Sequence, residues 1–252
     1  PDTLTSIPND TFSGCISLTK IVLPHGITSL GAINCPMDEW GIDKSVVMPV
    51  LTKRSQFEKV NEWAKSIESD RIVPFAGMYP NEGDGKEQIR IIAEMGFKGI
   101  KLHPDFQKFE IDSTKMDGIY EVLAELKMPI LFHAGDARFS YSGPERIANV
   151  MEKFPKLLIV AAHFGGYTEW EKATEYLVGK NVYFDTSSTL WKLPVEKANE
   201  MMKKHGIEKM LFGSDYPMWD HEGELARFNR LDLSAEEREL VMCGNAKNLL
   251  GL

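Results

Sequence analysis

Three histidines recur at a constant interval in this sequence. His103, His133 and His163 lie 30 residues apart, each just past a short apolar run, and Asp215 follows another such run. Imidazole nitrogens and carboxylate oxygens bind zinc and similar divalent metals, and the same groups move protons near neutral pH. If the ends of the apolar runs lie side by side, these residues predict a metal-dependent or acid-base catalytic site.

The interval of 30 residues is typical of a repeated unit of one strand, one helix and two loops. From residue 46 onward we predict seven strands, at residues 46–50, 72–78, 99–103, 129–133, 157–164, 182–185 and 209–213. The predicted helices cover residues 57–69, 86–96, 115–127, 144–154 and 195–205, and a further helix begins after Ser234. His205 is expected at the end of a helix and His221 in a loop. The strands are apolar at successive positions, which is typical of a parallel sheet covered on both faces.

This alternation fits either a closed barrel or an open, doubly wound sheet. An open sheet often carries a glycine-rich phosphate turn after its first strand, and the sequence contains neither G-x-G-x-x-G nor G-x-x-x-x-G-K-[ST]. Polar residues at many successive strand ends favour the barrel, and a length of 252 residues is normal for one. We therefore expect an α/β protein of the TIM-type (β/α)₈ barrel class.

The composition favours a protein that acts on a small-molecule substrate. The formal net charge of -8 disfavours binding to nucleic acid or to an anionic membrane surface. No run of about 18 apolar residues could span a bilayer, and the first residues lack the basic start and apolar stretch of a secretion signal. The three cysteines form no C-x-x-C pair, so we expect no disulfide framework and a reducing, cytoplasmic location.

Residues 37–252 resemble the amidohydrolase-related family of metal-dependent hydrolases, in the branch that includes aminocarboxymuconate semialdehyde decarboxylase. The order and spacing of several short segments carry the resemblance: residues 37–47, 99–104, 130–135, 163–166, 213–217 and 245–246. The resemblance implies a barrel with a divalent metal, most often zinc, at the mouth formed by the carboxyl ends of the strands. Such a metal lowers the pKa of its bound water while a carboxylate takes the proton.

The resemblance also implies roles for individual residues. His133 matches the metal ligand of the fifth barrel strand, and Asp215 matches the carboxylate of the eighth strand, which binds metal and handles protons. His163 matches the histidine of the sixth strand, which orients or polarises the substrate or binds a second metal. His103 and Lys101 match the motif of the fourth strand and are expected to contact the substrate.

Residues 1–36 differ from the rest of the chain. Residues 1–7 recur as residues 24–30, a shift of 23 residues, with small apolar side chains at regular positions between them. This segment resembles the leucine-rich repeats of bacterial surface antigens. We expect residues 1–36 to be a leucine-rich-repeat-like segment in place of the usual first βα unit, and residues 37–252 to form the barrel, whose first strand is therefore atypical or missing.

The first strand of the resembled family carries H-x-H, and this sequence contains no H-x-H. His25, after the short apolar run at residues 20–23, is the candidate for the missing metal ligand, although the repeat aligns it with Asp2 and so also favours a turn. The other three predicted ligands still give the minimum for a catalytic zinc site. A missing strand exposes a sheet edge, so we expect residues 15–30, or a second copy in a homo-oligomer, to cover it.

The leading functional prediction is a metal-dependent hydrolase or a non-oxidative decarboxylase. Its substrate would be a small carboxylated or cyclic molecule, attacked through a metal-activated water with Asp215 as proton carrier. The resemblance does not choose between cleavage of C–N, C–O and C–C bonds, because the same metal and carboxylate serve all three. Two alternatives remain: a pseudoenzyme barrel that lost its first-strand ligands and acts as a binding module, and an interaction module formed by the repeat segment.

Overall fold

The computed structural model describes residues 6–7, 29–30 and 34–252. Its strands, which all pair in parallel, are β1 (Ser6–Ile7), β2 (Ser29–Leu30), β3 (Ser45–Val47), β4 (Ile72–Pro74), β5 (Ala76–Gly77), β6 (Ile100–Leu102), β7 (Ile130–Phe132), β8 (Ile159–Ala161), β9 (Tyr183–Asp185) and β10 (Met210–Leu211). Every strand predicted from residue 46 onward is present, in the predicted order.

Neighbouring strands of the sheet are also neighbours in sequence. The six strands from β5 to β10 pair in sequence order, and β3 pairs with β4. β4 and β5 are two parts of one predicted strand, interrupted at Phe75, whose N–H donates to Val47 O at 2.9 Å. This stepwise order is that of a (β/α) barrel, in which each new strand is laid beside the last.

The register explains the 30-residue interval between His103 and His133. Leu102 is paired with Phe132 across β6 and β7, and Phe132 with Ala161 across β7 and β8. His103 and His133 each follow this row by one residue. Their strands therefore end at the same level of the sheet, and the 30-residue interval reflects equivalent positions in successive βα units.

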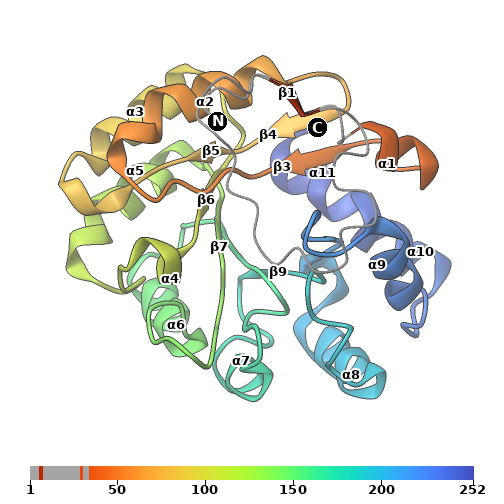
Figure 1. Cartoon of the computed structure of the whole chain (residues 1–252). Helices are drawn as coiled ribbons and strands as arrows, with labels where there is room; N and C mark the ends of the chain where they lie inside the picture. Colours follow the sequence, from red (N-terminus) through yellow and green to blue (C-terminus); the bar gives the residue numbers. More distant parts are fainter. Residues whose placement is uncertain (1–5, 8–28, 31–33) are drawn as a thin grey trace.

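Helices cover the outside of the curved sheet (Figure 1). The α-helices are α1 (Asn34–Glu39), α2 (Phe57–Ser66), α3 (Gly85–Glu94), α4 (Pro104–Gln107), α5 (Asp117–Leu126), α6 (Pro144–Lys153), α7 (Trp170–Tyr176), α8 (Val195–His205), α9 (His221–Phe228), α10 (Ala235–Glu239) and α11 (Asn245–Leu250). Short 3-10 turns are η1 (Arg54–Gln56), η2 (Pro80–Glu82), η3 (Thr114–Met116) and η4 (Ile207–Lys209), and η5 (Leu240–Gly244) is a π-helical turn. Ser234 caps α10 as predicted, accepting from Glu237 N–H in a capping box. Within the described residues, no helix is long and apolar enough to cross a bilayer.

Alternate residues of the strands enter two separate apolar clusters. Ile130 and Phe132 belong to the large cluster between the sheet and the helices, whereas Leu131 belongs to a small cluster on the other face of the sheet. Successive strand residues point to opposite faces, so the small cluster marks the inside of the barrel. Lys101 is paired with Leu131 and Asp185 with Leu211, which is also in the small cluster. Lys101 and Asp185 therefore point into the barrel, in contrast to a solvated surface lysine.

The two ends of the strand series lie at β3 and β10. Within the described residues no backbone pairing joins them. Leu249 and Leu250 of α11 pack in the same inner cluster as Val46 of β3 and Leu211 of β10. The terminal helix therefore supplies apolar contacts to both strands that border the opening.

Strands β1 and β2 pair in a register that matches the sequence repeat. Ser6 is paired with Ser29 and Ile7 with Leu30, which is the shift of 23 residues found between the two copies. Equivalent positions of successive repeats lie side by side in this way in a solenoid. Most of the segment expected to cover the sheet opening, and His25 within it, lie outside the described residues, so the repeat assignment and the covering of the opening stay predictions.

Candidate active site

The three predicted histidines lie together at the carboxyl ends of β6, β7 and β8. His133 Nδ1 is 3.0 Å from His163 Nε2. The ring of His103 stacks on His133 with a centroid distance of 4.0 Å and an interplanar angle of 9°. Phe106 stacks on the other face of His103 at 3.7 Å. The expectation that the strand ends bring these imidazoles together is confirmed.

His163 is fixed by residues at the end of β9. Its backbone N–H donates to Asp185 Oδ1 at 3.0 Å, and its Nδ1 lies 3.1 Å from Ser187 O and 3.0 Å from Ser187 Oγ. Ser187 Oγ in turn donates to Asp185 Oδ1 at 2.5 Å. The backbone of His163 is left-handed, with φ 61°. A non-glycine residue persists there only when its surroundings over-determine it, and these contacts do so.

The neighbours assign the tautomers of the imidazole pair. Ser187 O can only accept, so His163 Nδ1 carries the proton and His163 Nε2 has the lone pair. His163 Nε2 then accepts from His133 Nδ1, which leaves the lone pair of His133 on Nε2. That atom is buried and has no hydrogen-bond partner within the described residues. A buried nitrogen lone pair without a partner is costly, and it is a feature of a site that receives a ligand.

Burial keeps the imidazoles of His103 and His133 neutral near pH 7. Loss of hydration, followed by the charge of His163, holds the pKa of His133 well below its ordinary value. Burial, with Lys101 as the next cause, lowers the pKa of His103 to about 3. His103 Nδ1 accepts from Phe106 N–H at 3.4 Å, so its Nε2 carries the proton. Near neutral pH, His103 is a hydrogen-bond donor and not a cation.

Lys101 places its amino group in the barrel interior. Burial lowers the pKa of its ammonium group, while the carboxylates of Asp215 and Asp185 oppose that shift. Lys101 and Asp185 both point inward, and the carboxylates of Asp215 and Asp185 are the charged groups that act on the lysine. It is therefore placed to attract an anionic group that enters the mouth.

Asp215 reaches the site from the loop after β10. Its backbone is left-handed, with φ 56°, and its side chain is exposed. Ser188 Oγ donates to Asp215 Oδ2 at 2.6 Å, and Trp219 Nε1 donates to Ser188 Oγ at 2.9 Å. The carboxylate is thus tied to the end of β9, the strand next to β10.

Sequence reasoning missed the hydroxyl groups that hold the site. Ser187 orients His163 and Ser188 holds Asp215, but a serine after a strand is usually a loop cap. Residues 186–189 are four consecutive hydroxyl residues directly after a strand, and this run was the available signal. Asp185 caps the same loop by accepting from Ser187 N–H at 3.0 Å.

The donor set fits a divalent metal in its chemistry. Two adjoining imidazoles, one with a buried unpartnered nitrogen, and a carboxylate from a nearby strand are the ligands that zinc and manganese sites use. Among the described residues, however, no three His, Cys, Asp or Glu side chains lie close enough together to hold a metal. The residue predicted to complete the set, His25, lies outside the described part of the chain.

Two other histidines lie on helices α8 and α9. His205 ends α8 as predicted, with Nε2 donating to Val182 O at 2.8 Å and Nδ1 accepting from Gly179 N–H at 3.2 Å. His221, predicted in a loop, is instead the buried first residue of α9. Asp220 caps that helix by accepting from Gly223 N–H, which moves the helix start ahead of the histidine.

His205 predicts a loss of stability in acid. Burial lowers its pKa to about 4, whereas the unfolded chain takes up the proton near pH 6.5. The free energy of unfolding should therefore fall from about pH 6.5 toward pH 4, by about 2 kcal/mol from this residue. Urea unfolding at pH 7 and pH 4.5 should show a smaller loss in His205→Gln than in the wild type. Identical losses in both proteins would contradict the assignment.

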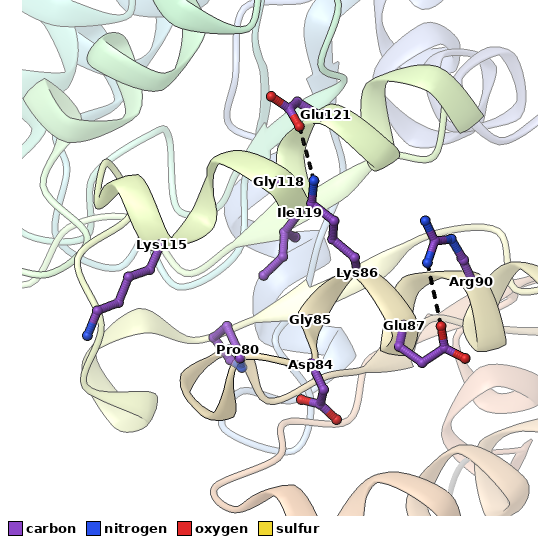
Figure 2. A pocket seen from close by; sticks show the side chains of 11 residues that line it. Pro80, Asp84, Gly85, Lys86, Glu87, Arg90, Lys115, Gly118, Ile119 and Glu121 are labelled. Atoms are coloured by element: carbon purple, nitrogen blue, oxygen red, sulfur yellow. Dashed lines mark hydrogen bonds and ion pairs between the residues drawn. The ribbon is translucent and has the colours of Figure 1, made fainter.

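A hollow of about 550 Å³ lies on the outer helical layer between α3 and α5. Figure 2 shows that charged side chains line it and pair with one another. Lys86 Nζ lies 3.3 Å from Glu121 Oε2, and Arg90 Nη1 lies 3.6 Å from Glu87 Oε2. The hollow contains none of the strand-end residues, so we assign the chemistry to the mouth of the barrel.

The fold and the site together define a class of protein. Parallel βα units with histidines and an acid at the carboxyl ends of successive strands are the arrangement of barrel enzymes. The chain belongs to the amidohydrolase family, whose model matches residues 37–252. The match confirms the resemblance over the same residues. No match was found among the curated proteins.

Several solved structures share this fold. The 2,6-dihydroxybenzoate decarboxylase from Rhizobium has a TM-score of 0.71 and 16% identity, covering 99% of this chain and 97% of that chain. The 5-carboxyvanillate decarboxylase from Novosphingobium aromaticivorans, complexed with manganese and 4-hydroxy-3-methoxy-5-nitrobenzoic acid, has a TM-score of 0.72 and 19% identity, covering 87% and 79%. An uncharacterised TIM-barrel protein from Bordetella bronchiseptica has a TM-score of 0.70 and 21% identity, covering 87% and 81%. These likenesses confirm the barrel-type α/β fold.

Proposed function

We propose that the protein is a metal-dependent, non-oxidative decarboxylase acting on a small carboxylated cyclic substrate. The observation that carries the proposal is the imidazole pair of His133 and His163 at 3.0 Å, with the inward-pointing cation of Lys101 beside it. A cation facing the mouth suits a substrate that carries a carboxylate. The similarity in fold to proteins named as hydroxybenzoate and carboxyvanillate decarboxylases supports the same reaction type.

The proposed metal ligands are His133, His163 and Asp215, which would have to move closer together on binding, because among the described residues no three such side chains lie within reach of one ion. When bound, it supplies a positive charge that stabilises negative charge on a substrate oxygen. Lys101 would attract the substrate carboxylate, and the Nε2–H of the neutral His103 would donate a hydrogen bond to it. The tautomer of His163, set by Ser187, leaves its lone pair on Nε2, so binding a metal through this atom would replace the hydrogen bond from His133 Nδ1–H.

Decarboxylation requires one proton for each molecule of carbon dioxide released. The C–C bond to the carboxylate breaks, its electron pair stays on the ring carbon, and a proton takes the place of the lost group. Asp215 is the acid proposed to carry this proton to the carbon, since it lies at the mouth and is held by Ser188. Proton transfer by a positioned group of this kind contributes about 10²- to 10⁴-fold in rate.

Turnover of two candidate substrates tests the proposal. The full chain is stripped with a chelator, loaded with manganese or with zinc, and incubated with 2,6-dihydroxybenzoate or 5-carboxyvanillate. We expect carbon dioxide release that is lost in the stripped protein and restored by one of the metals. Hydrolysis of a cyclic amide without carbon dioxide release would overturn the decarboxylase assignment in favour of a hydrolase. A folded protein that binds neither metal would instead support a binding module.

A further inference from the structure

The proposed proton carrier is held by one buried hydroxyl group. Ser188 Oγ donates to Asp215 Oδ2 at 2.6 Å, across a separation of 27 residues. Ser188 is only 5% exposed, whereas Asp215 is exposed to solvent. Both residues have left-handed backbones, with φ 51° for Ser188 and 56° for Asp215. Since non-glycine residues rarely adopt this conformation unless neighbours impose it, contacts around Ser188 must fix it in place.

Two tryptophans provide those contacts. Trp219 Nε1 donates to the Ser188 hydroxyl oxygen at 2.9 Å, and Trp191 Nε1 donates to the Ser188 backbone oxygen at 2.9 Å. The two indole rings stack on each other with a centroid distance of 5.6 Å and an interplanar angle of 27°. An indole N–H can only donate, so the Ser188 oxygen accepts from Trp219 and its own hydrogen is directed to Asp215.

Helix α9 contacts Trp219 through an arginine. The guanidinium of Arg227 lies over the Trp219 ring at 5.0 Å from its centroid. Glu224, which is 1% exposed, holds Arg227 through an ion pair of 2.6 Å. The Ser188 hydroxyl thus connects the carboxylate of Asp215 to Trp219 and, through Trp219, to the ion pair on α9.

We propose that Ser188, clamped by Trp219 and Trp191, is the positioning residue that sets the orientation of the Asp215 carboxylate. This inference rests on the proposed function, in which Asp215 binds the metal and carries the proton. With Oδ2 fixed by the hydroxyl, the carboxylate plane is set and Oδ1 is presented in one direction. Loss of a hydrogen-bond partner of a metal ligand typically lowers metal affinity about 10- to 100-fold.

Manganese affinity of the full chain tests the role of Ser188. Free manganese is counted by its electron paramagnetic resonance signal, which needs no turnover. Ser188→Gly suits the left-handed backbone and removes only the hydroxymethyl group, and we expect it to weaken manganese binding about 10- to 100-fold. Trp219→Phe keeps a ring but removes the N–H donor, and should weaken binding by a smaller factor. Ser214→Ala is the matched control, because within the described part of the chain the one hydrogen bond of the Ser214 hydroxyl is accepted from Tyr216 N–H at 3.4 Å.

The outcomes separate this inference from the proposed function. If Asp215→Asn loses manganese while Ser188→Gly binds like the wild type, the positioning role of Ser188 is overturned and the metal site stands. Equal losses in Ser188→Gly and Ser214→Ala would also overturn it, because the whole loop would then set the affinity. If the wild type and Asp215→Asn bind equally, the metal role of Asp215 fails. The hydrogen bond between Trp219 and Ser188 is then tested in the ¹⁵N-labelled, metal-free protein. The Trp219 Nε1–H resonance should shift in Ser188→Gly, and an unshifted resonance would refute this hydrogen bond.

Discussion

Replacing Asp215 with asparagine should lower kcat for the proposed decarboxylation by about a thousandfold, within the range that a positioned proton-transferring group contributes. Asparagine accepts the Ser188 hydrogen bond as aspartate does, and it tolerates the left-handed backbone at φ 56°. The variant should therefore fold like the wild type. What it loses is the negative charge and the exchangeable proton, which are the two properties the site needs.

The matched control for this variant is Asp220→Asn. Asp220 lies in the same loop and is also exposed, but it caps α9 by accepting from Gly223 N–H at 2.6 Å. Asparagine is as good a helix cap as aspartate, so this variant should keep wild-type turnover. Steady-state rates at saturating metal and substrate give the comparison. Turnover of Asp215→Asn within tenfold of the wild type would remove Asp215 from the reaction.

Replacing Gly135 with alanine should destabilise the protein by about 3 kcal/mol or more. Gly135 follows His133 by two residues and has φ +70°, and a Cβ added there would lie 2.8 Å from backbone atoms of Gly166 and Tyr167. The backbone of those residues cannot yield easily, because Tyr167 N–H donates to Ala134 O at 2.6 Å. The substitution therefore forces apart the loops that carry the imidazole pair.

Gly96→Ala separates the steric effect from the backbone effect. Gly96 has a similar φ of +76°, but a Cβ there would meet nothing within 4 Å. It should cost only the left-handed penalty of about 1–2 kcal/mol. Urea unfolding of both variants measures the difference, and manganese affinity should fall in Gly135→Ala alone. Equal destabilisation of the two variants would show that the close contact with the backbone of Gly166 and Tyr167 has no effect on stability.

The order of the strands could be predicted from the sequence because each is a short, continuously apolar run at a regular interval. The same regularity placed His103 and His133 at one level of the sheet, and His163 one position past that level, because Phe132 is paired with Ala161. The short helix at residues 170–176 was missed. With only seven residues and a charged, aromatic composition, it presents too few apolar positions for a period of 3.6 to be recognised.

The hydrogen bonds that hold the site residues in place could not be predicted from the sequence. The contacts of Ser187 with His163 and of Ser188 with Asp215 join residues 24 and 27 positions apart. They depend on the pairing of β8 with β9 and of β9 with β10, and no local pattern encodes which hydroxyl meets which acceptor. The direction of Lys101, in contrast, follows from a local rule. Successive strand residues alternate between the two faces, so Lys101 points inward once Leu131, its partner on β7, is known to lie on the inner face.

The packing of α11 beside β3 and β10 has a consequence for how the molecule folds. Val46 and Leu250 share the inner cluster although they lie on the order of 200 residues apart in the sequence. Contacts of such separation carry a large loop-closure cost and form late. The strands from β5 to β10 can assemble one neighbour at a time through short connections, so the imidazole pair should meet early. The packing of α11 beside β3 and β10 joins the most distant parts of the chain, so we expect it to be the slow step of folding.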